Sequence, residues 1–309
     1  MKGLALRFGL VLLPACVLAQ DSIVSGTHES QYVSEPGAHG VVEGYNWTQV
    51  FIDPNPTLRF VYTQLSTPTK FYQDETYLQI TKDQRFLRIG RLRTAFGLSD
   101  WTEVAYRGFI YQPIIRYSKF GTDIYIGRLE TGIQYSDLVG KIQIDASIVD
   151  PESTYTRKII PNQFSYGSLK LQTWTGKVVY GASIYGPINN IYADDTKEKG
   201  LSVHALYNEN RLKLRAEYIK GFDSTPSSNG WYVDGAYRLP RPWHRTEFVA
   251  RTQSASLSGS SRINLQTVGV RQFIGENFQL TIGNTFGSSS PMVAWQKGWT
   301  GALLVQIPF

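Results

Sequence analysis

The sequence is poor in cysteine and histidine, and it lacks long apolar runs beyond its first twenty residues. Cys16 is the only cysteine among 309 residues, and it lies in an N-terminal stretch that we expect to be removed. Without it, the chain can form neither a disulfide framework nor a cysteine metal site. Because no later apolar run is long enough, a helix-spanning membrane protein is excluded as well.

Catalytic signatures are also scarce. The four histidines (His28, His39, His204 and His244) are scattered, and neither HExxH nor GxSxG occurs. His204 shares a predicted strand face with Ser202, but no carboxylate is suggested as its orienting partner, and a triad is recognised by geometry. A structural or solvated histidine is the interpretation we favour. We therefore expect no enzyme, no catalytic residue, no metal site and no cofactor.

The N-terminus resembles an export signal. Lys2 and Arg7 flank the start of an apolar run that ends in the small-residue exit "VLAQ". This pattern predicts a signal peptide over residues 1–19, cleaved after Ala19, and a single mature domain over residues 20–309. The formal charge then falls from +6 to about +4, a balance too mild to suggest nucleic-acid binding.

Strict alternation of apolar and polar residues replaces the missing apolar runs. In "RLKLRAEYIK", Leu212 and Leu214 lie on one face, and Lys213 and Arg215 lie on the other. "GKIQIDASIV" and "ENFQLTIGNTFG" show the same period of two, which predicts strands with one apolar and one polar face. Such strands average to neutral hydropathy, so the mean hydropathy of −0.23 is compatible with a membrane barrel.

The connections between these strands alternate in length. Short ones such as "KDQ", "TG" and "NEN" alternate with long ones such as "GPINNIYADDTKEKG", as in outer-membrane barrels. We predict an all-β, transmembrane antiparallel β-barrel of sixteen strands with both termini at the short-turn end; fourteen strands is the alternative. The predicted strands are 22–33, 45–52, 57–65, 74–81, 85–93, 129–136, 141–150, 166–174, 177–186, 200–208, 211–220, 230–239, 243–254, 262–273, 277–286 and 299–309.

Two features of this pattern do not fit simple alternation. In 262–273, Val268 and Val270 fall on the face that carries Asn264 and Gln266, and a bulge would resolve the conflict. In 85–93, Arg91 and Arg93 fall on the lipid face with Leu87 and Ile89. We expect one of the two arginines to turn inward.

The C-terminal strand "WTGALLVQIPF" ends on Phe309. A final strand with a terminal phenylalanine resembles the assembly signal of Gram-negative outer-membrane barrels. The resemblance implies that Phe309 is read by the barrel-assembly machinery and that the protein lies in the bacterial outer membrane, in contact with lipid and lipopolysaccharide.

A second stretch of the sequence makes the resemblance to outer-membrane barrels more specific. "LRIGRLRTAFGLSD" (residues 87–100) is similar to the strand-to-loop passage of Gram-negative porins, where a loop after the fifth strand folds into the barrel and constricts it. A barrel of sixteen strands leaves a wide aqueous channel, so selection among small solutes requires such backbone inside the lumen. We predict an inward-folded constriction loop within about 94–128; an external flap is the alternative. Its candidate residues are Asp100, Trp101, Glu103, Arg107 and Tyr111.

Basic residues outnumber acidic ones on the predicted inward faces. An acidic loop opposite a basic wall would produce a transverse field and a mild anion preference. The basic candidates are Arg59, Arg88, Lys141, Lys170, Arg211, Lys213, Arg215, Arg245 and Arg251. The acidic candidates are Asp145, Asp234, Glu217 and Glu247.

The sequence therefore predicts a porin that admits small hydrophilic solutes by passive diffusion, and the resemblance implies a homotrimer. The alternative from another class is a non-conducting barrel with a structural, adhesion or assembly role. Channel conductance would discriminate between these two hypotheses.

Overall fold

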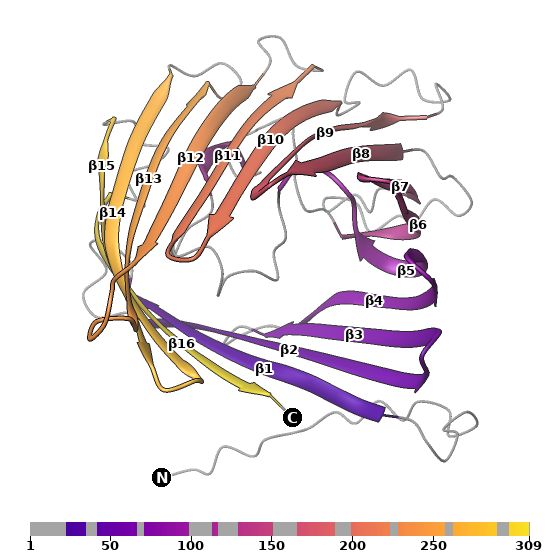
Figure 1. The fold of residues 1–309 in the computed structure, drawn as a ribbon, viewed down its shortest axis with the longest axis horizontal. Helices are drawn as coiled ribbons and strands as arrows, with labels where there is room; N and C mark the ends of the chain where they lie inside the picture. Colours follow the sequence, from indigo (N-terminus) through magenta and orange to yellow (C-terminus); the bar gives the residue numbers. More distant parts are fainter. Residues whose placement is uncertain are drawn as a thin grey trace.

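The computed structural model describes residues 23–34, 42–66, 71–98, 113–116, 129–150, 166–188, 199–222, 228–256, 262–288 and 297–308. Within these ranges the chain forms a single closed barrel (Figure 1). No helix in the described ranges is long and apolar enough to cross a membrane.

Sixteen antiparallel strands make the barrel, and each pairs with its neighbours along the chain. The pairing of β1 with β16 closes it. The predicted fold class and strand number are thus confirmed. The strands are β1 (Ile23–Ser34), β2 (Val42–Asn55), β3 (Leu58–Ser66), β4 (Phe71–Lys82), β5 (Arg85–Arg93), β6 (Leu129–Val139), β7 (Ile142–Asp150), β8 (Tyr166–Thr175), β9 (Val178–Pro187), β10 (Gly200–Glu209), β11 (Leu212–Gly221), β12 (Asn229–Arg238), β13 (Thr246–Ser256), β14 (Ile263–Ile274), β15 (Phe278–Gly287) and β16 (Gly298–Pro308).

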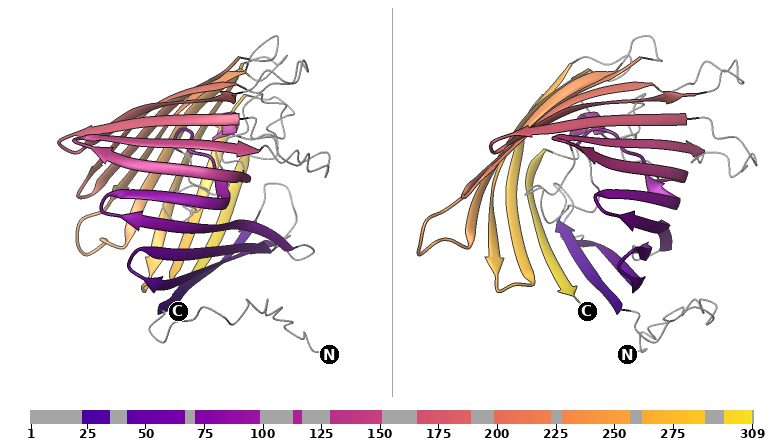
Figure 2. Two further views of the ribbon diagram at one scale, coloured as in Figure 1. Left: turned by 90° about the vertical axis from the view of Figure 1, so that its right-hand side faces the viewer. Right: turned by 45° about the vertical axis from the view of Figure 1, so that its right-hand side comes forward.

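Tight hairpin turns gather at one end of the barrel (Figure 2). Asp83 and Asn210 begin two of these turns with positive φ angles of 56° and 44°, a conformation that Asp and Asn tolerate better than most side chains. The start of β1 and the end of β16 lie at the same end. The turn between β12 and β13 is longer, because the predicted strand 243–254 begins only at Thr246.

Apolar side chains cover the outside of most of the barrel. On β15, Phe278, Leu280 and Ile282 are exposed, whereas Gln279 and Thr281 on the opposite face are buried toward the interior. Trp299 on β16 follows the same rule and is 70% exposed. Exposed apolar residues on a closed barrel suit contact with acyl chains, whereas polar residues inside suit contact with water.

β14 contains no bulge that would resolve the conflict of facing in 262–273. β14 pairs residue for residue with β13 from Ile263 to Gln272 and with β15 from Leu265 to Ile274. Asn264 and Gln266 lie outside with the valines, whereas Ile263 and Leu265 face the interior, where another part of the chain covers them. The register shifts of the barrel occur instead between β2 and β3 and between β3 and β4.

The shift between β3 and β4 bears on the two arginines of β5. Arg91 pairs with Thr76 and stays on the outer face. Arg93 forms an ion pair of 2.5 Å with Asp74, beside the bulge, and Asp74 also accepts a hydrogen bond from Trp47. Since Trp47 shares the inward face of β2 with Gln49, the guanidinium of Arg93 lies on the lumen side.

Candidate functional site: the lumen and its inserted segment

The inner wall of β11–β13 carries a group of three charges. Asp234 accepts two hydrogen bonds from Arg251, at 2.6 and 3.0 Å, and a third of 3.0 Å from Arg215. Asp234 and Arg251 are almost fully buried, whereas the side chain of Arg215 is 20% exposed. One carboxylate between two guanidiniums leaves a net positive charge on the wall.

A second group of the same kind lies nearer the short-turn end. Glu247 contacts Arg238, at 2.8 Å, and Arg271, and the two guanidiniums stack against Phe273. Glu247 and Arg271 are both 2% exposed, whereas Arg238 is 43% exposed. The two groups share strands β12 and β13, so their surplus charges add on one side of the lumen.

The opposite wall, on β2–β6, combines arginines with aromatic rings. Arg88 donates hydrogen bonds to Gln79 and Gln134 and lies 5.0 Å from the ring centroid of Tyr77. Arg59 is paired with Asp53 near the short-turn end. This wall therefore carries fewer surplus charges than β11–β14.

The chain enters the barrel directly after β5. Thr94 donates a hydrogen bond to Glu130 of β6, which also accepts one of 2.8 Å from Tyr185 of β9. Gly97, with φ +64°, then turns the backbone so that its N–H donates to Ser183 of β9 at 2.7 Å. Residues 94–98 thus cross from β5 toward the inner wall of β9.

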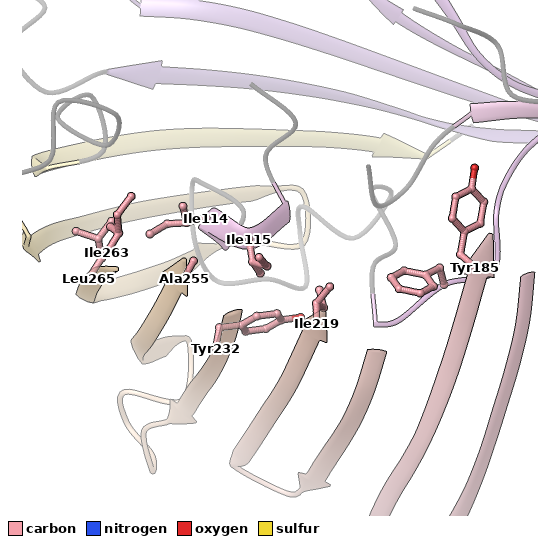
Figure 3. Close-up of a cluster of buried hydrophobic side chains, with 9 residues drawn as sticks. Ile114, Ile115, Tyr185, Ile219, Tyr232, Ala255, Ile263 and Leu265 are labelled. Carbon is pink, nitrogen blue, oxygen red and sulfur yellow. The ribbon is translucent and has the colours of Figure 1, made fainter. Parts of the chain in front are cut away.

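The same segment is attached again at the short 3-10 helix η2 (Ile114–Arg116). The backbone N–H of Ile114 donates a hydrogen bond of 2.8 Å to Gln253 on the inner face of β13. Ile114 and Ile115 are 0% and 1% exposed, because they pack against apolar residues of the wall (Figure 3). We call this wall surface the apolar socket; it consists of Ile219, Tyr232, Ala255, Ile263 and Leu265.

We call residues 94–98 and 113–116 together the inserted segment. Its contacts with β9, β11 and β13 place both described parts inside the barrel, and Figure 3 shows Ile114 and Ile115 of η2 beside the wall residues. The candidate constriction residues Asp100, Trp101, Glu103, Arg107 and Tyr111 lie outside the described residues, as do Phe309 and residues 1–19.

The basic candidates fall into two groups. Arg59, Arg88, Lys170, Lys213, Arg215 and Arg251 belong to inward-facing positions of strands. Lys141, Arg211 and Arg245 instead lie in turns at the short-turn end, because their strands begin one residue later.

The acidic candidates are all buried and already engaged by protein groups. Asp145 is 6% exposed and accepts hydrogen bonds from Ser136, at 2.5 Å, and Gln143. Glu217 is 3% exposed and accepts three hydrogen bonds from neighbouring groups. The carboxylates of Asp145 and Glu217 are therefore hydrogen-bonded to groups of the protein itself.

Several residues of the site escaped the sequence analysis. Arg238 lies two positions after Ala236 on the face of Asp234, so alternation alone could have found it. Arg271 was missed because the facing of its strand was uncertain. Ser183, Gln253 and Glu130 carry no local signal, since their partners are far away in the sequence.

Ser202 and His204 are both buried on the inward face of β10. Ser202 donates its hydroxyl hydrogen to Glu217 at 2.7 Å. The register also places Glu217 opposite His204, a carboxylate that the sequence analysis did not anticipate. Among the described residues, no three His, Cys, Asp or Glu side chains gather as metal ligands.

A polar surface also exists on the outside of β1–β5. We call it the outer polar patch; its members are His28, Ser30, Asn46, Thr48, Gln64, Gln73, Thr76 and Arg91. His28 lies 2.8 Å from Thr48 and 3.1 Å from Ser30, which donates to Asn46 at 2.7 Å. These residues lie in the middle of their strands and in the half nearer the long connections. In the half nearer the short turns the outer face is apolar, with Val24, Ile80 and Ile89 exposed.

Comparison with known proteins relates this architecture to solved structures. No protein-family model and no curated protein matches the chain. A porin of Rhodopseudomonas blastica, solved as a triple mutant, superposes with a TM-score of 0.64 at 11% identity, covering 93% of this chain and 100% of that one. OmpF of Salmonella typhi, in complex with daunomycin, gives a TM-score of 0.67 at 10% identity and covers 93% and 97%.

The chain has the porin fold. OmpT, an outer membrane protein of Vibrio cholerae solved in its trimer form, is similar as well, with a TM-score of 0.61, 10% identity and coverage of 93% and 99%. The porin fold is a multi-pass β-barrel of the bacterial outer membrane, and its apolar exterior and polar interior are both present here.

Proposed function

We propose that this protein is a channel of the outer membrane through which small hydrophilic solutes diffuse passively. The observation that carries the proposal is a closed barrel with a charged, polar interior into which a segment of the chain is folded and attached. A sixteen-stranded barrel without an insertion would leave a wide aqueous pore. The insertion supplies a means of narrowing it.

The proposed selectivity is a mild preference for anions. The two groups around Asp234 and Glu247 each contain one more base than acid, and Lys213 lies on the same wall. If Asp100 and Glu103, which lie in the sequence between the two parts of the inserted segment, face this wall, the field runs across the pore and favours polar solutes over apolar ones. Such a channel needs neither a cofactor nor catalysis.

Planar lipid bilayers test both parts. Purified, refolded protein is expected to produce stepwise conductance, and the reversal potential in a salt gradient is expected to show a modest anion preference. A folded barrel that conducts no ions would favour the non-conducting alternative with a structural, adhesion or assembly role. Clear cation selectivity would contradict only the anion preference.

We propose further that the functional unit is a homotrimer with the outer polar patch at its subunit contacts. A hydrogen-bonded cluster centred on His28 and Thr48 is costly to place against acyl chains. A second copy of the chain would cover it with protein and leave the apolar face of β7–β16 to lipid and lipopolysaccharide. Semi-native electrophoresis and mass measurement in detergent test whether the protein is a trimer. We expect the barrel-assembly machinery to insert it into the outer membrane.

A further inference from the structure

Glu217 lies where the inserted segment first meets the far wall. Its Oε1 accepts the backbone N–H of Leu98 at 3.0 Å and the hydroxyl of Ser202 at 2.7 Å. Its Oε2 accepts the hydroxyl of Tyr232 at 2.8 Å. The carboxylate therefore bridges strands β10, β11 and β12 and a backbone group of the inserted segment.

The wall itself holds this carboxylate through two hydrogen bonds, independently of the inserted segment. Ser202 and Tyr232 come from the two strands that flank β11, and the register places Tyr232 directly opposite Glu217. A hydrogen bond from a backbone N–H to such a preorganised carboxylate is stronger than one to a neutral acceptor. Because Glu217 is 3% exposed, little water competes for it.

The neighbouring contacts show why one side chain can matter so much here. Gly97 is attached to Ser183 through a neutral hydroxyl, whereas Leu98 is attached to a carboxylate. Phe96 meets the ring of Tyr185 edge-on, with 6.3 Å between the ring centroids. Of these three consecutive attachments, only the one at Leu98 has a charged acceptor.

We propose that Glu217 is a positioning residue, which fixes the inserted segment against β11 and so sets the bore of the channel. It does not act as a pore-lining charge in contact with solutes. This inference rests on the proposed channel function for its consequence, but the attachment itself can be measured without any conductance.

A spin label measures the attachment directly. Replacement of Cys16, if it is retained at all, leaves a chain without cysteine, so Leu98→Cys accepts a single nitroxide. We expect an immobilised spectrum in the parent barrel and about a tenfold larger mobile fraction with Glu217→Ala, since a charged hydrogen bond is lost. Glu217→Gln keeps an acceptor for the Leu98 N–H and is expected to restore most of the immobilised signal.

The matched control is Asp145→Ala. It removes another buried wall carboxylate, one held by Ser136 and Gln143, and is expected to leave the line shape at position 98 unchanged. If Glu217→Ala does not fold, Tyr232→Phe removes one donor to the same carboxylate and is expected to give intermediate mobility. An immobile label in folded Glu217→Ala or Tyr232→Phe barrels would overturn the proposal.

Single-channel recording separates this inference from the proposed function. Glu217→Ala is expected to increase current noise and the passage of larger solutes, whereas Glu217→Gln is expected to resemble the parent. If the parent barrel does not conduct but the label responds as expected, the channel function fails and the attachment stands. If the barrel conducts but the label does not respond, Glu217 has no positioning role.

Discussion

The inner wall of β11–β14 and the outer wall of β1–β5 break the same rule in opposite directions. Inside the barrel, where polar residues are expected, Ile219, Ile263 and Leu265 are apolar and fully buried. Outside, where apolar residues are expected, His28 and Thr48 are polar and hydrogen-bonded to each other. Elsewhere, as on β15, the alternation is regular.

The apolar residues inside the barrel have a direct cause, because Ile114 and Ile115 of the inserted segment cover them. An inverted alternation therefore marks a place where protein, rather than water or lipid, covers the barrel wall. Applied to the outer polar patch, the same reasoning supports a covering subunit.

The largest effect is expected from Ile115→Asp. It places a carboxylate in the apolar socket, and burying an unpaired charge there costs several kcal/mol, so we expect η2 to leave the wall. In planar bilayers the conductance step should increase. Ile115→Val is the matched control, with a cost of about 1 kcal/mol and an unchanged step. An unchanged conductance step in both variants would show that the apolar socket does not influence the width of the pore.

A smaller but clear effect is expected on assembly. Three members of the outer polar patch are replaced together in the variant His28→Leu, Thr48→Val and Gln64→Leu. The change makes this face as apolar as the rest of the outer surface of the barrel. If the patch forms subunit contacts, we expect monomers in semi-native electrophoresis, since each lost hydrogen bond is worth about 1 kcal/mol. Thr252→Val on the outer face of β13 should leave the oligomer intact. Trimers that survive the triple change would refute the proposed contact surface.

Ion selectivity should respond more modestly. Arg215→Gln removes one surplus charge but leaves the buried pair of Asp234 and Arg251 intact. We expect the anion-to-cation permeability ratio to fall by a factor of about two, measured as a shift in reversal potential. Arg245→Gln, in a turn at the barrel end, should shift it less. Equal shifts would show that the inner wall has no special role.

The smallest effect is expected from Gln266→Val on the outer face of β14. The change extends the apolar row of Val268 and Val270, and surface changes of this kind stay within about 0.5 kcal/mol. Thermal unfolding in detergent should hardly change. Leu265→Ala, its inward neighbour, should by contrast cost about 2–5 kcal/mol, because a side chain is lost from the apolar socket. Similar shifts of the unfolding temperature for both variants would mean that stability does not depend on whether a side chain at this end of β14 faces inward or outward.

Strand number and most strand facings could be predicted from the sequence, because period-two alternation is a local property. The regular strands, such as 211–220 and 277–286, were predicted within a residue or two of β11 and β15. The facing of strand 262–273 could not be predicted, because its inward apolar residues pack against η2, which lies far away in the sequence.

The site was less predictable for the same reason. Basic wall positions on β8, β11 and β13 follow from alternation, but the roles of the acids do not. Glu217 and Asp145 look like pore-lining charges in the sequence, and only the register and the inserted segment show that both are engaged by neighbouring groups. Arg93 could not be placed because its direction depends on a register shift between two other strands.

The seam between β1 and β16 has a consequence for biogenesis. These two strands pair over eight residue positions, from Thr27 with Pro308 to Ser34 with Gly301, yet β1 is the first and β16 the last of the sixteen strands in the sequence. Until the final strand emerges, two unsaturated edges face any environment the polypeptide meets. The barrel can therefore close only after both of these strands have been synthesised.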